Sequence, residues 1–436
     1  MTRSFDHEVA VVGAGPAGIG TAVALERLDL EYTVLERDCI GASFRQWPAE
    51  MRLLTPSFPA NAFGTRDLNA ITPDTSPALA LDCEHPTGNQ YADYLEAVAE
   101  FHDLPVETGV DVAGVDPIRD DLSDGSDETA GFTLETSDDS ITTRFVVWAA
   151  GEYQYPTTGP IAGAEHGVHV AGVDSWDAYA RTHEIASETD VTPESTSESA
   201  ETTTAADAAP QPAADGAGTA MTPHSDDVVI IGGAESGVDA ALALADAGCS
   251  VTVLDDDGTW QFRSPDPSEV LSPRTNQRLE AALADEQPIG LVAGVRADRI
   301  EQTADEDPTA DDDHLEYAVV TTDGDRFYSQ VPPVLATGFD GSLTLVEDLF
   351  VLEDGVADLT ERDESTTTPG LFLVGPQVAH NGQKFCFIYK YRQRFAVVAD
   401  TLGERLGVDT DSLEEYRETN MFLEDLECCE PEYCDC

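Results

Sequence analysis

The stretch that decides the fold is VAVVGAGPAGIGTAVALERLDLEYTVLERD, residues 9–38. It begins with a short apolar run typical of a buried strand, passes through a glycine-rich turn into a helix-forming segment, and ends in a second apolar run. The second run closes with an acid, Glu36, twenty-three positions after Gly13 of the turn. This order of features predicts a strand, a helix and a second strand that is parallel to the first.

The same pattern occurs a second time, in VVIIGGAESGVDAALALADAGCSVTVLDDD, residues 228–257. Gly232 and Asp255 are again twenty-three positions apart, so the turn, the helix and the terminal acid recur at the same spacing. The repeat predicts an α/β fold with two Rossmann-like dinucleotide-binding domains, the second inserted into the first.

The residue types of the first turn fit the pyrophosphate of a dinucleotide. Gly13 permits the tight turn, Gly15 leaves room for the pyrophosphate against the backbone, and Gly18 lets the helix pack closely on the strand. The free N–H groups and the positive dipole end of the helix stabilise the pyrophosphate charge. Glu36 is placed to accept hydrogen bonds from a ribose diol. A turn with no ligand would not require the strands, the helix and the acid at these positions.

The second turn differs from the first at its middle position. Gly232 and Gly237 correspond to the outer glycines, but Ala234 stands where the first copy has a glycine. One extra methyl group holds a pyrophosphate slightly off the backbone, which looser forms of the motif tolerate. The alternative is a unit that is kept only as a scaffold.

The composition restricts the partners of the chain. Its 436 residues suffice for two or three domains, and 85 acids against 22 bases give a net charge of −63. Such a charge repels nucleic acid and anionic membranes, and it suits a hydrated surface in a salt-rich cytoplasm, where salt screens the self-repulsion. The sequence has no apolar run of membrane-spanning length and begins with no signal-peptide pattern. We expect a cytoplasmic protein that binds neither nucleic acid nor membrane; a homodimer is compatible with the sequence.

Three further stretches complete a resemblance. The second copy is preceded by VVWAAGEYQYP (residues 146–156) and followed by VLATGF (334–339), and GLFLVGP (370–376) stands near the end. With the paired glycine motifs, these stretches resemble the two-dinucleotide-binding flavoproteins, which include thioredoxin reductases, bacillithiol-disulfide-reductase-like enzymes and flavin-containing monooxygenases. The resemblance implies that the first copy holds FAD and that the second holds NAD(P)H, which delivers a hydride to the flavin.

The resemblance also implies binding residues. We expect FAD to contact Gly13, Gly15, Pro16, Ala17, Gly18, Glu36, Arg37, Gly151, Gly375 and Lys384. We expect the nicotinamide cofactor to contact Gly232, Gly233, Ala234, Ser236, Gly237 and Asp255. NADH is expected as that cofactor because Asp255, Asp256 and Asp257 would repel a 2′-phosphate. NADPH stays open, because Arg263 is close enough in sequence to reach that phosphate.

These assignments divide the chain into an FAD-binding domain of residues 1–160, an NAD(P)-binding domain of residues 161–333, and a return to the FAD-binding domain over residues 334–427. Residues 184–225 consist mainly of Ser, Thr, Ala, Glu, Asp and Pro. They cannot bury enough apolar surface to offset the entropy of ordering, so we predict a disordered acidic insertion there. Residues 428–436 form a Cys-rich tail.

Departures from the family patterns favour one branch. The chain contains no C-x-x-C pair, Phe44 stands five residues after Cys39, and Ala17 occupies the place of the cysteine in the bacillithiol-reductase-like motif. IGASFRQW, residues 40–47, is similar to the I-G-G-x-W stretch of flavin monooxygenases, whose F-x-G-x-x-x-H fingerprint is partly present in GAEHGVHVAGVDSW. We therefore expect an FAD-dependent NAD(P)H oxidoreductase of monooxygenase-like type that reduces oxygen or a small-molecule acceptor.

One long stretch contains no acid. Residues 365–399 include Lys384, Lys390, Arg392 and Arg394, which either face the flavin or substrate or form ion pairs with the acidic surface. Residues 45–66 are a second candidate wall of the site, with apolar and aromatic side chains that would exclude water. The catalytic candidates are His380 and Asn381, which could hydrogen-bond the flavin or the acceptor; the alternative is a structural histidine.

Half of the eight cysteines stand in the tail, as Cys428, Cys429, Cys434 and Cys436, whereas the others are scattered and read most simply as buried thiols. The spacing of the four tail cysteines does not match that of structural zinc sites. The tail could instead bind a soft metal or act as a mobile dithiol, and it is similar to the vicinal cysteine pair of mercuric reductases. A tail without a role in turnover is the alternative. Two other functions stay open: a thiol or metal-ion reductase that uses these cysteines, and a non-catalytic redox sensor.

Overall fold

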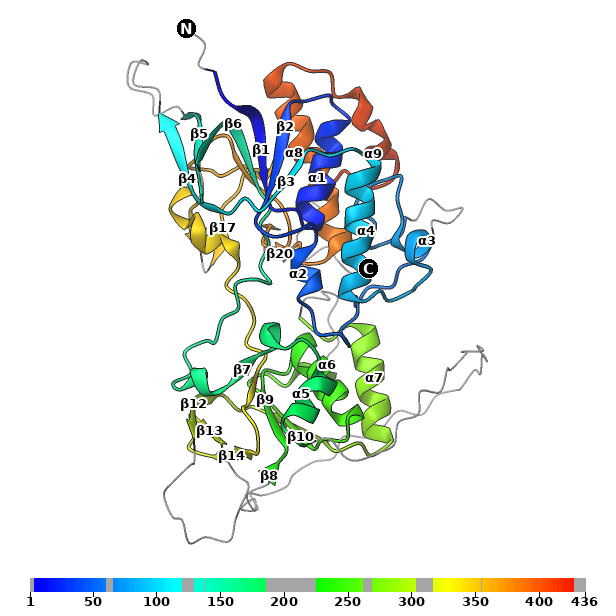
Figure 1. The fold of residues 1–436 in the computed structure, drawn as a ribbon, viewed down its shortest axis with the longest axis vertical. Coiled ribbons are helices and arrows are strands. Elements are labelled where there is room, and N and C mark those ends of the chain that lie inside the picture. The colour runs from blue at the N-terminus through cyan, green and yellow to red at the C-terminus, as the bar shows by residue number, and fades with distance from the viewer. Residues whose placement is uncertain are drawn as a thin grey trace.

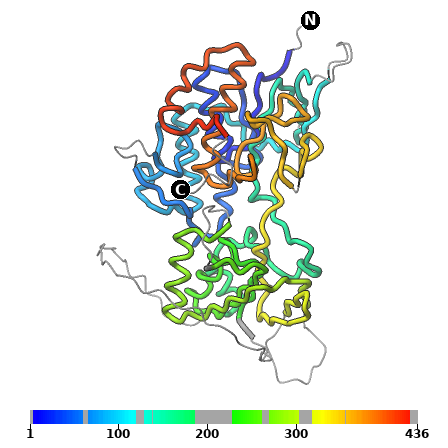
Figure 2. Tube along the Cα trace, turned by 180° about the vertical axis from the view of Figure 1, so that it is seen from behind, coloured from blue at the N-terminus to red at the C-terminus, as the bar shows by residue number. Residues whose placement is uncertain are grey.

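The computed structural model describes residues 4–59, 66–119, 129–137, 139–185, 225–261, 269–302, 317–353 and 355–426. The chain forms two lobes that are stacked along the long axis of the molecule (Figure 1). The N-terminal and C-terminal parts of the chain form the upper lobe together, and the middle part forms the lower lobe. Seen from behind, two extended segments connect the lobes (Figure 2). This arrangement confirms the prediction that the second domain is inserted into the first.

The upper lobe is built on a seven-stranded sheet with the order β3-β2-β1-β6-β5-β4, and β18 also pairs with β6. The strands β1, β2, β3, β6 and β18 pair in parallel, and β4 and β5 extend the sheet in antiparallel fashion. Their bounds are β1 His7–Val12, β2 Tyr32–Glu36, β3 Val106–Thr108, β4 Val112–Arg119, β5 Thr129–Thr136, β6 Ser140–Trp148 and β18 Leu371–Leu373.

Helices from both ends of the chain pack together in the upper lobe. Helix α1 contacts α8 and α4. The contact with α8 depends on Gly20, because a Cβ at that position would lie 2.2 Å from the ring of Phe395. The helices of this lobe are α1 Pro16–Glu26, α2 Ala42–Arg45, α3 Pro77–Leu81, α4 Gly88–Phe101, α8 Ile388–Leu406 and α9 Glu414–Glu418.

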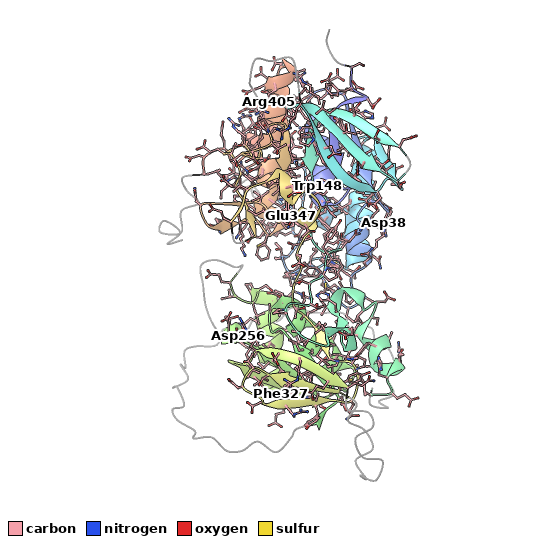
Figure 3. All side chains as sticks on the ribbon, turned by 90° about the vertical axis from the view of Figure 1, so that its left-hand side faces the viewer. Asp38, Trp148, Asp256, Phe327, Glu347 and Arg405 are labelled. Atoms are coloured by element: carbon pink, nitrogen blue, oxygen red, sulfur yellow. The ribbon has the colours of Figure 1, made fainter. Side chains whose placement is uncertain are left out.

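The lower lobe contains a parallel sheet with the order β11-β10-β9-β15-β7 and a smaller sheet with the order β12-β13-β14-β8. Its strands are β7 Val168–His169, β8 Ser225–Asp226, β9 Val228–Ile231, β10 Val251–Asp255, β11 Ile289–Ala293, β12 Ala297–Gln302, β13 Tyr317–Thr321, β14 Arg326–Ser329 and β15 Val334–Leu335. Its helices are α5 Trp176–Thr182, α6 Glu235–Asp246 and α7 Pro273–Ala284. Asp256 and Phe327 mark this lobe in Figure 3.

The structure moves two of the boundaries expected from sequence. Strand β15 pairs with β9 and β7, so the second domain extends past residue 333 to Leu335 at least. At the ends of the expected insertion 184–225, Ile185 packs against the core of the second domain, and Ser225 begins β8. The rest of that insertion lies outside the described residues, as does the Cys-rich tail. None of the helices in the described ranges is both long and apolar enough to cross a bilayer.

Contacts at the connecting segments and at Glu50 join the lobes. The connecting segments pair with each other at Pro156 and Phe339. In addition, the Glu50 carboxylate of the upper lobe accepts hydrogen bonds from the Ser175 hydroxyl at 2.6 Å and from the Trp176 N–H at 3.0 Å, so it caps the N-terminus of α5 in the lower lobe. Burial raises the pKa of Glu50, but these hydrogen bonds outweigh it and lower that pKa. The two domains are therefore held against each other at the connecting segments and at Glu50.

Candidate functional site

The two glycine turns have the same geometry. Gly13 and Gly232 adopt φ angles of 102° and 103°, a region that L side chains rarely enter. Each donates its N–H over 2.8 Å to a carbonyl of the second strand, that of Leu35 or Leu254. A Cβ on Gly13 would lie 2.7 Å from the carbonyl oxygen of Ala149, and one on Gly232 would lie 2.3 Å from that of Ala336. Both turns therefore require glycine at the first position.

The third and middle positions differ in what surrounds them. A Cβ on Gly18 would lie 1.8 Å from the carbonyl oxygen of Gly13, so the helix packs directly on the turn. A Cβ on Gly15 would have no atom within 4 Å. The backbone of Gly15, at φ −80° and ψ −171°, matches that of Ala234, at φ −77° and ψ −168°. The open space thus lies before the helix N-terminus, where a pyrophosphate of a dinucleotide fits.

The acids that close the second strands bind the turns. Glu36 accepts hydrogen bonds from the N–H groups of Ala14 at 2.7 Å and Asp38 at 2.8 Å. Asp255 accepts them from Gly233 at 2.6 Å and from Gly258 at 2.7 Å. Burial raises the pKa of Glu36, and the two N–H donors oppose that rise. The repeat seen in the sequence is therefore also a repeat of hydrogen bonds.

A cavity of about 400 Å³ begins at the first glycine turn. Gly13, Gly15 and Glu36 line one part of it, and aromatic side chains line another. The aromatic part includes Phe44, Trp47, Tyr153, Phe339, Phe387 and Tyr391. A pocket with a glycine turn at one side and an apolar wall at the other suits a dinucleotide that carries a planar ring system.

A second cavity of about 590 Å³ includes Ala234 of the second glycine motif. It lies between the domains, since the upper lobe contributes Pro376 and Lys384 and the lower lobe contributes Glu235 and Thr259. The two cavities share a wall formed by Leu54, Glu152, Glu235, Phe339, Pro376, Cys386 and Phe387. We call this set the junction. A group bound in one cavity can therefore contact a group bound in the other.

The structure gathers most of the residues expected to bind FAD. The first cavity is lined by Gly13, Gly15, Pro16, Ala17, Glu36, Arg37 and Gly151. Gly18 lies behind the turn, and a Cβ on Gly375 would lie 3.3 Å from the Cβ of Ala17. Lys384 lines the second cavity. Residues 51–55 of the predicted aromatic and apolar wall also line the first cavity.

The residues expected to bind the nicotinamide cofactor are more dispersed. Ala234 lines the second cavity, and Ser236 lines the first. Gly232, Gly233, Gly237 and Asp255 are not among the lining residues of either cavity. Over Gly233 lies the indole of Trp260, which donates a hydrogen bond of 2.8 Å to the Gly233 carbonyl. The sequence analysis did not identify Trp260, and its only local signal is its place after the acidic end of the strand.

His380 and Asn381 belong to a different environment. The His380 Nε2 lies 2.6 Å from a carboxylate oxygen of the buried Asp363, and Asn381 donates a hydrogen bond of 3.2 Å to the carbonyl of Leu426. Neither residue is among those that line the two cavities. Their catalytic role stays a prediction, and this geometry explains both residues without it.

The acid-free stretch has two kinds of partner. Arg392 and Arg394 are buried, and Arg392 donates to the carbonyls of Asp67 and Ala70. Lys390 lies over the ring of Phe387, with its Nζ 5.7 Å from the ring centroid. Because these two arginines are buried, their part of the stretch does not belong to the acidic surface of the protein. This accounts for part of the lack of acids in residues 365–399. The stretch also contributes Cys386, Phe387, Ile388 and Tyr391 to the first cavity.

Two junction residues were missed by the sequence analysis. Glu152 follows the predicted Gly151 directly, so its position was the available signal. Cys386 was interpreted as a scattered thiol, and no sequence pattern identifies it. The four tail cysteines lie outside the described residues. Within the described ranges, no group of three or more His, Cys, Asp or Glu side chains could hold a metal ion.

Paired dinucleotide folds with adjoining cavities define a two-domain oxidoreductase of the FAD-dependent class. The family model described as pyridine nucleotide-disulphide oxidoreductase matches residues 10–185 and 216–375. The chain belongs to this family, and it is therefore an enzyme. This finding argues against the alternative hypothesis of a non-catalytic redox sensor.

Solved structures share the fold at low sequence identity. Bacillithiol disulfide reductase Bdr from Staphylococcus aureus is 19% identical, with a TM-score of 0.62 over 91% of this chain and 98% of that chain. A flavin-containing monooxygenase from Stenotrophomonas maltophilia is 16% identical, with a TM-score of 0.61 over 92% and 99%. The thioredoxin reductase of T. acidophilum is 15% identical, with a TM-score of 0.54 over the same shares. The fold is thus common to reductases and monooxygenases.

Proposed function

We propose that this enzyme holds FAD in the first cavity and NADH in the second, and passes a hydride between them at the junction. The observation that carries the proposal is the shared wall of two cavities, of which the first is lined by Gly13 and Gly15 of the first glycine motif and the second by Ala234 of the second motif. Oxygen or a small-molecule acceptor then takes up the electrons. Bound FAD would supply the two-electron chemistry, so the chain's own residues have to bind, orient and exclude water.

Under this proposal, one set of residues binds the cofactor and another set excludes water. The open space at Gly15 and the N–H groups of α1 would hold the pyrophosphate, and Glu36 would bind the ribose. Phe44, Trp47 and Tyr391 would exclude water from the isoalloxazine ring. The charge of −63 supports the proposal of a salt-rich cytoplasm, so assays belong in concentrated KCl.

Anaerobic NADH is expected to bleach the flavin absorbance of the purified enzyme, and air is expected to restore it. NADPH should act about tenfold less efficiently, a difference of about 1.4 kcal/mol, because carboxylates near the ribose would repel its 2′-phosphate. Asp255 is held by three backbone N–H groups, whereas Asp256 pairs with Arg296 at 2.7 Å. Stopped-flow spectra with each cofactor measure the ratio.

The control for this preference is the double variant Asp256→Ser/Asp257→Ser, in which the advantage of NADH should shrink. If NADPH reduces the flavin as fast as NADH, the preference is wrong but the hydride route stands. If neither cofactor bleaches the flavin, the proposed function itself is wrong.

A thiol or metal-ion reductase is the second candidate, and one observation favours it: Cys386 lies in the junction. The tail cysteines could relay electrons from there to a disulphide or a thiophilic metal. Under this proposal, deletion of residues 428–436 should leave flavin reduction by NADH unchanged and should abolish turnover with a disulphide or a soft-metal acceptor. A truncated enzyme that turns over every acceptor as well as the full chain, and binds as much metal, removes the tail from the mechanism. Cys386→Ser tests the junction thiol separately.

A further inference from the structure

Glu152 is an acidic junction residue to which the proposed function gives no role. It lies in the turn after β6, the strand whose last residue, Trp148, is labelled in Figure 3. The positive φ of Gly151, 69°, reverses the chain there. Two backbone hydrogen bonds fix this turn: the Tyr155 N–H donates to the Glu152 carbonyl and the Ser342 N–H to the Gly151 carbonyl, both at 2.9 Å. The backbone of Glu152 is therefore fixed beside the wall that both cavities share.

The carboxyl of Glu152 has no hydrogen-bond donor among the residues that the structure describes, although Lys384 exerts an attraction on it. The other junction acid differs. Glu235 of α6 accepts hydrogen bonds from the Thr275 hydroxyl at 2.6 Å, from the Ser272 N–H and from the Ser272 hydroxyl at 3.4 Å. Its oxygens are therefore occupied, whereas those of Glu152 are available to a bound molecule.

The remaining groups near Glu152 come from β20, from α8 and from the segment between them. Lys384 belongs to β20 (Gln383–Lys384), Cys386 follows it, and Tyr391 belongs to α8. Burial raises the pKa of Tyr391 far above its ordinary value, so this phenol does not release a proton near neutral pH. Burial also raises the pKa of Glu152, and the charge of Lys384 opposes that rise. Glu152 can therefore hold a proton under milder conditions than an exposed carboxyl.

We propose that Glu152 is the proton donor to the electron acceptor at the junction. This inference rests on the proposed function, because the acceptor must be reduced there. A hydride from NADH carries two electrons and one proton, but reduction of O₂ to H₂O₂ consumes two electrons and two protons. In this step the O–H bond of the Glu152 carboxyl breaks, and an O–H bond forms on the acceptor. Solvent then returns a proton to the carboxylate, so that NADH, O₂ and one H⁺ give NAD⁺ and H₂O₂.

The test separates reoxidation from reduction. Enzyme reduced with dithionite is mixed with oxygenated buffer across a pH series, so the result does not depend on NADH. In the wild type, the reoxidation rate should fall as the pH rises through the pKa of Glu152, because the donor loses its proton. Glu152→Gln should lower the rate about 10²-fold or more and abolish that pH dependence, and Glu152→Asp should restore part of both. Glu347→Gln, an exposed acid labelled in Figure 3, is the matched loss of one charge and should behave as the wild type.

A second readout needs no turnover. The infrared difference spectrum of wild type minus Glu152→Gln, recorded on the protein stripped of cofactor, should show a carboxylic-acid band that titrates above the range of an exposed glutamate. A band that titrates as an ordinary carboxyl, or a reoxidation rate that Glu152→Gln leaves intact, overturns the proposal. Normal anaerobic bleaching by NADH in the same variant would show that the proposed function survives this failure.

Discussion

Gly15→Leu is expected to give a folded, colourless protein. The backbone of Gly15 is at φ −80° and ψ −171°, which any L residue adopts, and the added Cβ meets no atom within 4 Å. The leucine side chain would instead occupy the space before α1 that we assign to the pyrophosphate of FAD. We expect FAD affinity to fall at least about 100-fold, or about 2.8 kcal/mol, with no loss of stability in the protein without cofactor. Absorbance after desalting measures the flavin content.

Ala234→Leu is the matched control, because Ala234 has the same backbone conformation in the second motif. This variant should stay yellow and lose its reduction by NADH. The pair of variants therefore assigns one cofactor to each cavity. A Gly15→Leu protein that keeps a full complement of flavin would exclude the first cavity as the FAD site, and a fully reducible Ala234→Leu protein would exclude the second as the NADH site.

The two glycine motifs show which parts of the candidate site were predictable from the sequence. The turn, the helix and the acid of each motif are adjacent in the chain, so their spacing alone specified the geometry that the structure shows at Gly13 and Gly232. The glycine at the middle position also predicted room for a pyrophosphate, and a Cβ on Gly15 would indeed have no atom within 4 Å.

The junction was not predictable for a different reason. Glu152 and Cys386 are more than two hundred residues apart, and no periodicity connects them. They meet because the turn after β6 and the segment between β20 and α8 line the same two cavities. Trp260 likewise covers Gly233 through a tertiary contact. Long-range packing of this kind leaves no local signal.

The basic residues of the acid-free stretch were interpreted by charge alone, and the structure separates them by burial. Lys384 faces the second cavity, whereas Arg394 is fully buried. Its partner, Asp363, stands thirty-one residues earlier in the chain. A sequence pattern shows that acids are missing from 365–399, but it cannot show that a buried acid just before the stretch satisfies its arginine.

Asp363→Asn is expected to destabilise the upper lobe by about 3–5 kcal/mol, because it leaves the charge of Arg394 buried and uncompensated. The Asp363 carboxylate binds Arg394 Nε at 2.9 Å and one Nη at 3.1 Å, and it also contacts His380. Arg394 and Asp363 both have an exposed fraction of 0%. Asparagine keeps the size of the side chain and tolerates the φ of 62° at this position, so the variant removes the charge with little backbone strain.

The control is Glu424→Gln, which breaks the exposed ion pair with Arg362 and should cost no more than about 1 kcal/mol. Thermal unfolding in concentrated KCl measures both, and Asp363→Asn should lower Tm by roughly 10 °C, at about 2–4 °C per kcal/mol for a domain of this size. Below its Tm, the variant should reduce and reoxidise its flavin at wild-type rates if His380 serves this network only. A variant that unfolds as the wild type but loses turnover would show that the His380 and Asp363 pair acts in the reaction, as the sequence first suggested.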